Sequence, residues 1–107
     1  MVQQIDTEMN SYITLINFTQ QGLETIQEAP RRTAAFKAAA KKAGVNVTQV
    51  FKTLGEYDGV IVFEAEDDAA ATGLMLSLSS LGKVRTKTMR AFNDAEFADI
   101  VATRPKI

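Results

Sequence analysis

The chain has 107 residues, of which 46% are hydrophobic and 23% are charged, which is the size and composition of one globular domain. Twelve Lys and Arg balance thirteen Asp and Glu, so the net charge of -1 gives no basic field for nucleic acid or for an anionic membrane. The chain contains no Cys and no His, which excludes disulfides, iron–sulfur clusters, thiolate zinc sites, cysteine nucleophiles, imidazole bases and histidine-ligated haem. We therefore expect no cofactor.

The first ten residues are polar and lack the basic flank and the apolar run of a secretory signal. No apolar stretch approaches the roughly 20 residues that are needed to span a bilayer. We expect residues 1–10 to be a flexible extension and residues 11–107 to be a single domain. We also expect the protein to be cytoplasmic, with neither a membrane nor a nucleic acid as partner.

Strands and helices alternate along the predicted domain. In chain order we predict a strand at 11–18, helical structure at 20–43, strands at 45–54 and 60–65, a helix between Asp67 and Gly82, a strand at 83–92 and a helix between Asn93 and Pro105. Pro30 divides the first helical segment into a short and a longer helix, because proline lacks an amide hydrogen and restricts the residue before it. The Gly-rich turn at residues 55–59 joins the second and third strands as a hairpin.

Side-chain periodicity adds detail to three of these elements. The strand at 45–54 is expected to direct Phe51 to its apolar side. The leucine stripe of the helix after Asp67 is expected to end in a buried Leu81. Asn93 and Glu96 have the spacing of a capping box at the start of the last helix.

This order of elements is the split βαβ pattern of ferredoxin-like folds, an α+β class with an antiparallel four-stranded sheet. The extra helix at the C-terminus follows this pattern. Right-handed crossovers give the strand order 4-1-3-2, which places the first and third strands in the centre of the sheet. Those two strands are also the ones that are apolar on both faces, so topology and composition agree independently.

The helices of such a domain cover only one face of its sheet, so the second apolar face needs another cover. We expect a homodimer or a higher homo-oligomer in which two sheets pack face to face. The alternative is that the last helix or the N-terminal extension covers this face within one chain.

Polar residues gather at one end of the predicted sheet, where the first strand ends, the hairpin turns and the fourth strand begins. They are Asn17, Thr19, Glu56, Tyr57, Asp58, Lys83 and Arg85. Such a cluster can bind a polar small molecule or move a proton. The predicted contacts to an organic ligand, which would lie between sheet and helices, are Asn17, Tyr57, Asp58 and Arg85. A structural role is the alternative, because Gly and Asp are the residues that a hairpin turn requires.

Two other groups of charged residues are assigned to the surface. The acids at residues 64–68 are compatible with a divalent cation, but helix capping explains them and their spacing is not that of an EF-hand, so we expect no metal. The basic residues of the first helical segment are assigned to a solvated helix face rather than to an anion site. They are Arg31, Arg32, Lys37, Lys41 and Lys42.

Several segments resemble the GYD domain family, in matching order along the chain. They are Tyr12–Thr19 followed by Gln21 and Gly22, the turn Gly55-Glu56-Tyr57-Asp58, Ser80–Thr86 and Arg90–Phe92. The family name refers to the glycine, tyrosine and aspartate that correspond here to Gly55, Tyr57 and Asp58. The resemblance extends from Tyr12 to the last helix.

The resemblance implies a dimeric α+β barrel, in which ferredoxin-like subunits pair through their sheets. Proteins related by fold include cofactor-independent monooxygenases, lactone isomerases and ligand-sensing domains, and the fold alone does not choose among them. Three functions therefore stay open. The first is a module that binds a small organic ligand, and the second is an enzyme of the oxygenase or isomerase kind, in which Tyr57 orients an acidic substrate and Asp58 takes a proton. The third is a structural assembly unit without a ligand.

Overall fold

The computed structural model describes residues 9–107. The predicted flexible extension at residues 1–10 lies outside the described residues, except for Met9 and Asn10, and Asn10 already belongs to the first strand. The elements are β1 (Asn10–Phe18), α1 (Gln20–Glu24), the 3-10 helix η1 (Ile26–Glu28), α2 (Ala29–Lys42), β2 (Asn46–Lys52), β3 (Gly59–Ala65), α3 (Asp68–Ser80), β4 (Val84–Ala91) and α4 (Asp94–Thr103). Within these residues, every helix is too short or too polar to cross a bilayer.

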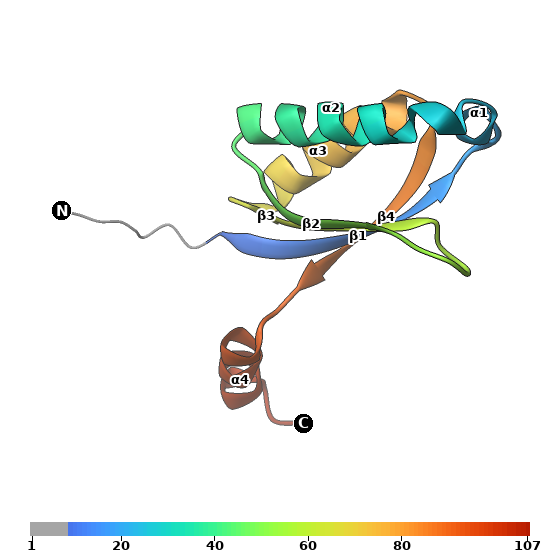
Figure 1. The fold of residues 1–107 in the computed structure, drawn as a ribbon. Helices are drawn as coiled ribbons and strands as arrows, with labels where there is room; N and C mark the ends of the chain where they lie inside the picture. The colour runs from blue at the N-terminus through green and yellow to red at the C-terminus, as the bar shows by residue number, and fades with distance from the viewer. Residues whose placement is uncertain (1–8) are drawn as a thin grey trace.

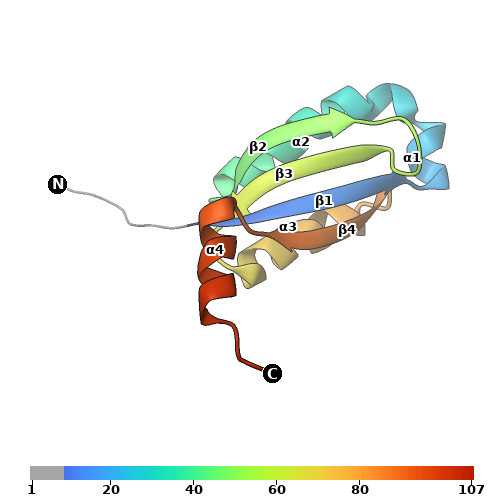
Figure 2. The ribbon, with the colours of Figure 1, turned by 90° about the horizontal axis from the view of Figure 1, so that it is seen from below.

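The four strands form one antiparallel sheet in the order β2-β3-β1-β4. This order is the predicted 4-1-3-2 arrangement, with β1 and β3 in the centre, so the ferredoxin-like α+β fold is confirmed. Helices α2 and α3 lie over one face of the sheet, and α4 extends away from the opposite face (Figure 1). Figure 2 shows that opposite face, with α4 at the end of the sheet where β1 begins.

The core lies between the sheet and the two covering helices. Tyr12 and Phe63 are cross-strand partners, and their rings stack with centroids 5.3 Å apart. Phe36 of α2 and Met75 of α3 are buried against them. Thr14 is fully buried, but its hydroxyl lies 2.8 Å from the Thr88 hydroxyl, so its polar atom is satisfied.

Side-chain caps define where the helices begin. The Asp67 carboxylate accepts a hydrogen bond from the Ala70 amide at 2.8 Å at the start of α3. At the start of α4, the Glu96 amide donates to the Asn93 side chain at 2.8 Å and the Asn93 amide donates to the Glu96 carboxylate at 2.9 Å. The predicted capping box is therefore confirmed.

Two predictions about apolar side chains are wrong. An irregularity between Val47 and Gln49 shifts the alternation of β2, so Val50 packs against the core and Phe51 is 55% exposed. Leu81 is 65% exposed, because α3 ends at Ser80 and Leu81 is already its C-cap.

The sheet face opposite α2 and α3, here called the open face, keeps apolar side chains from all four strands. They are Ile13 and Leu15 from β1, Phe51 from β2, Val60 and Val62 from β3, and Met89 from β4. Helix α4 buries none of its own residues, and its apolar side chains Phe97, Ile100 and Val101 are exposed. The last helix therefore leaves the open face uncovered, so the alternative that this helix covers the second apolar face is wrong.

Gly22 of α1 lies close to the backbone of Lys83, the residue before β4. A Cβ atom on residue 22 would overlap the Lys83 carbonyl oxygen. We expect Gly22→Ala to lower the free energy of unfolding by about 1–3 kcal/mol, because the backbone must shift. Gly73→Ala in α3 is the control, since nothing lies within 4 Å of its Cβ position, and it should be neutral or stabilising. Thermal denaturation followed by circular dichroism measures both, and an unchanged melting temperature for Gly22→Ala contradicts the prediction.

Candidate functional site

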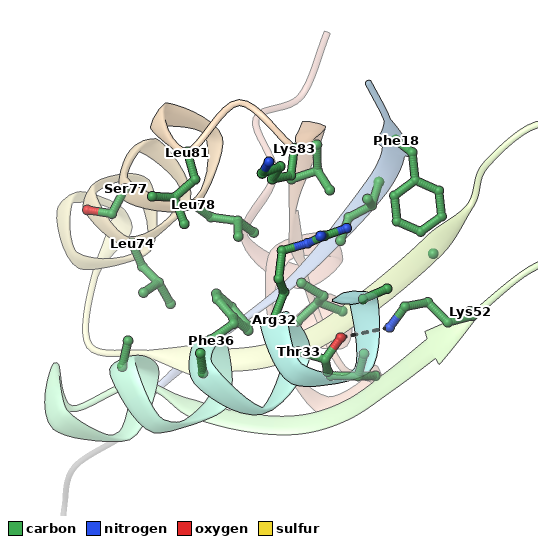
Figure 3. Close-up of a pocket in the computed structure, with 18 of the residues that line it drawn as sticks. Phe18, Arg32, Thr33, Phe36, Lys52, Leu74, Ser77, Leu78, Leu81 and Lys83 are labelled. Atoms are coloured by element: carbon green, nitrogen blue, oxygen red, sulfur yellow. Dashed lines mark hydrogen bonds between the residues drawn. The ribbon is translucent and has the colours of Figure 1, made fainter. Parts of the chain in front are cut away.

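An open cavity of about 330 Å³ lies between α2, α3 and the covered face of the sheet. This volume is in the range of small-molecule pockets. The walls are mainly apolar and come from both helices and from the sheet (Figure 3). They include Ile16, Phe18, Phe36, Val50, Ile61, Leu74, Leu78 and Leu81. The leucine stripe that the sequence assigned to the core is thus, in large part, the wall of this cavity.

Small residues leave the space open. Ala29, Ala35 and Ala39 line the cavity from α2, and Gly59 lines it from the start of β3. None of these residues has a side chain long enough to reach across to the opposite wall. The cavity therefore follows from the composition of α2 as well as from its position.

Three cationic side chains line the cavity from three different segments. Arg32 comes from α2, Lys52 from the end of β2 and Lys83 from the loop before β4. The Lys52 ammonium donates to the Thr33 hydroxyl at 2.9 Å, and the Arg32 guanidinium donates to the Thr25 carbonyl at 3.1 Å. Each of these acceptors is neutral.

Lys52 is exposed as a whole, but partial burial lowers its pKa below the ordinary value of 10.5, and the charge of Lys37 lowers this pKa further. No Asp or Glu is among the residues that line the cavity. In the part of the chain that the structure describes, the ion pair within 4.0 Å is Arg31 with Glu28, at 2.7 Å and outside the cavity. The cavity consequently has mainly apolar walls and, among the residues that line it, cations without an acidic partner.

The predicted site residues lie together at the turn end of the sheet, but outside the cavity lining. The Asn17 side-chain amide donates to the Glu56 carbonyl at 3.0 Å. The Asp58 carboxylate accepts from the Phe18 amide at 2.9 Å, and the Asp58 amide donates to the Ile16 carbonyl at 2.8 Å. These hydrogen bonds fasten the hairpin turn to the end of β1.

Tyr57 and Arg85 lie beside this turn. Arg85 is exposed and is the cross-strand partner of Asn17. Tyr57 is half-buried, and the Lys87 ammonium lies 5.6 Å from the centre of its ring. Lys87 pairs with Leu15, which belongs to the open face, so this ring is placed near the open face rather than in the cavity. The ligand-binding role of Asn17, Tyr57, Asp58 and Arg85 stays a prediction.

Two cations of the cavity, Arg32 and Lys52, were missed as site residues. Arg32 was assigned to a solvated helix face, but it is half-buried and lines the cavity. The sequence spacing does indicate this position, because Arg32 precedes the buried Phe36 by four residues and therefore lies on the same, inward face of α2. Lys52 carries no comparable signal, since the irregularity in β2 sets which way it points.

The acids at residues 64–68 do not gather into a metal site. Among residues 9–107, no group of three or more potential metal-ligating side chains comes together. Asp67 caps α3, and the Asp68 carboxylate accepts a hydrogen bond from the Tyr12 hydroxyl at 2.6 Å. Burial, and then the hydrogen bond with Asp68, raise the pKa of Tyr12 above its ordinary value.

Comparison with known proteins gives one family match, a curated relative and a solved structure. The family model of the GYD domain matches residues 12–101. This chain belongs to the GYD domain family. A relative from Thermus thermophilus, named glutamine synthetase and cystathionine beta-lyase binding protein, is 37% identical over 95 residues, which are 88% of this chain and 97% of that protein.

The solved structure is the feast or famine regulatory protein from M. tuberculosis in complex with L-methionine. It has a TM-score of 0.62 and 17% sequence identity, over 85% of this chain. The matched part is 58% of that chain, so this GYD domain protein spans less than two thirds of it. The similarity supports the ferredoxin-like fold.

Asp58 is expected to stabilise the fold through its contact with the end of β1. Asp58→Ala removes the acceptor for the Phe18 amide, so we expect the free energy of unfolding to fall by about 1–3 kcal/mol. Asp58→Asn keeps a side-chain oxygen and should lose less. Chemical denaturation of the three proteins measures the difference. Equal stability of Asp58→Ala and the unsubstituted chain contradicts this structural role.

Proposed function

We propose that this protein binds a small organic molecule in the cavity between the sheet and helices α2 and α3. The observation that carries the proposal is the mainly apolar cavity of about 330 Å³, with a few polar groups among its lining residues. Apolar walls provide most of the affinity for a small ligand, and a few placed polar groups set its orientation. The M. tuberculosis protein of similar fold is in complex with L-methionine, which supports small-molecule binding at the level of the fold.

The polar groups of the cavity favour binding over catalysis. They are cations and hydroxyls, including Lys52, Thr33 and Ser77, which can donate hydrogen bonds to a ligand. The alternative is an enzyme of the oxygenase or isomerase kind, in which Tyr57 and Asp58 act on the substrate. This alternative requires both residues to reach a ligand from positions outside the cavity lining.

Filling the cavity tests the proposal. Ala39→Phe places a ring in the cavity from α2, so we expect the affinity for octanol and for octanoate to fall by roughly tenfold or more. Ala38→Phe is the control, because Ala38 lies outside this cavity. Isothermal titration calorimetry measures the affinities, and circular dichroism verifies the fold. Unchanged binding to Ala39→Phe, or no binding to the unsubstituted protein, overturns the proposal.

A second copy of the chain is proposed to cover the open face. The apolar side chains of β1 and β3 on this face support self-association, as do the exposed apolar residues of α4. Charge complementarity supports the same partner, because α4 carries Asp94, Glu96 and Asp99 whereas the turn end of the open face carries Arg85 and Lys87, with Glu64 at its other end. A two-fold axis that reverses the strand direction brings α4 of one copy toward the Arg85 end of the other.

Val60→Glu tests this interface. Val60 lies on the open face between Leu15 and Phe51, so a carboxylate there should prevent two sheets from packing. We expect native mass spectrometry to show an oligomer for the unsubstituted protein and a monomer for Val60→Glu. Lys41→Glu on the exposed face of α2 should stay oligomeric. A monomeric unsubstituted protein contradicts the proposed self-association.

A second candidate function is the binding of another protein. The name of the Thermus thermophilus relative describes it as a binding protein of two enzymes, and the match covers nearly all of that relative. Exposed apolar side chains at the hairpin tip, such as the fully exposed Leu54, and on α4 favour this candidate. A purely structural assembly unit is the third candidate. For all three, a cytoplasmic location stays a prediction from the sequence.

A further inference from the structure

We infer that the ligand of the cavity is an amphipathic organic anion, with a short alkyl chain or a single ring that ends in a carboxylate. This inference rests on the proposed function, because it names the ligand class of the same cavity. It comes from the arrangement of charge around the cavity, which an apolar core alone does not require.

Two of the three cations lie toward one end of the cavity. In Figure 3, Arg32 and Lys52 lie on the side opposite Leu74 and Ser77, and Phe36 lies between the two sides. Lys83, from the loop before β4, lies on the Leu81 side, away from Lys52. A bound molecule therefore meets the charges of Arg32 and Lys52 at one end, and the leucines with the Ser77 hydroxyl at the other. An elongated amphipathic anion matches both ends.

The positive charge has no acidic partner around the cavity. The Lys52 ammonium contacts a hydroxyl, and the Arg32 guanidinium contacts the Thr25 carbonyl, the Thr25 hydroxyl and, at 3.4 Å, the Gly22 carbonyl. Lys37 adds further positive charge near Lys52. The lowered pKa of Lys52 means that its charge reduces the stability of the ligand-free protein. A ligand carboxylate would provide the missing partner through charge-assisted hydrogen bonds.

The same arrangement disfavours other ligand classes. An amine would place a fourth cation beside Arg32, Lys52 and Lys83. A neutral alcohol as long as the anion would pack against the apolar walls but would leave the three cations without an anionic partner. A polyanion such as a nucleotide would place several charges against walls that are mainly apolar. One small anionic group on an apolar body remains the best match.

Three probes of equal length test the ligand class, namely octanoate, octanol and octylamine. We expect octanoate to bind to the full-length protein at least roughly tenfold more tightly than octanol, and octylamine to bind most weakly. Lys52→Met should lower the octanoate affinity by roughly tenfold and leave the octanol affinity unchanged. Lys41→Met is the matched control, since Lys41 lies outside this cavity, and it should bind as the unsubstituted protein. Lys83→Met repeats the test at a second cation.

The outcomes separate this inference from the proposed function. Equal affinities for octanol and octanoate overturn the anionic class and leave small-molecule binding intact. No binding of any probe overturns both. A preference for octanoate that survives Lys52→Met and Lys83→Met also overturns the inference, because the anion is then recognised elsewhere.

A stability measurement without ligand tests the charge argument. Because the pKa of Lys52 is lowered on folding, its charge destabilises the folded chain below that lowered pKa, and the effect diminishes as pH rises toward 10.5. We expect Lys52→Met to have a higher melting temperature than the unsubstituted protein at neutral pH, with the difference narrowing at alkaline pH. Lys37, whose charge acts on this ammonium, is unchanged in both proteins, as are Arg32 and Lys83, the other cations that line the cavity. An equal or lower melting temperature of Lys52→Met at neutral pH overturns the claim that an unpaired charge is held there.

Discussion

The pairing of β1 with β3 at the centre of the sheet is the constraint on which the rest of the structure depends. Both strands are apolar on both faces, and two helices cover only one of these faces. On the covered face, the alanines of α2 are too small to fill the space against α3, so a cavity remains. On the other face, apolar side chains stay open to a partner. The two proposed binding surfaces thus have one origin, a sheet with more apolar surface than its own helices cover.

The residues that give the GYD family its name act on this architecture from the turn end of the sheet. Asp58 holds the Phe18 amide and immediately precedes Gly59, and both Phe18 and Gly59 line the cavity. Asn17 holds the turn from the opposite side through the Glu56 carbonyl. An aspartate at position 58 is therefore explained by its role in positioning this end of the cavity, whether or not its carboxylate contacts a ligand. Tyr57, beside Lys87, lies where a second sheet would pack.

The sequence predicts those features that local chemistry determines. The strand order follows from right-handed crossovers, and the two strands that are apolar on both faces agree with it. The helix starts follow from Asp67 and Asn93 as caps. Phe51 was misplaced because the irregularity in β2 shifts the alternation without a glycine or proline to mark it. Leu81 was misplaced because helical periodicity does not tell where α3 ends. The cavity could not be predicted from the sequence, because leucines and alanines follow the same periodicity whether they line a cavity or fill a closed core.

The cations of the cavity are what separate a binding site from an incompletely filled core. We expect an incompletely filled core to be lined by apolar residues alone. An ammonium group without a partner at such a cavity adds a free-energy penalty to that of the cavity itself. Here Arg32, Lys52 and Lys83 line the cavity from three segments that are distant in the sequence, and partial burial lowers the pKa of Lys52. Its presence is consistent with a site in which the missing negative charge arrives with the ligand.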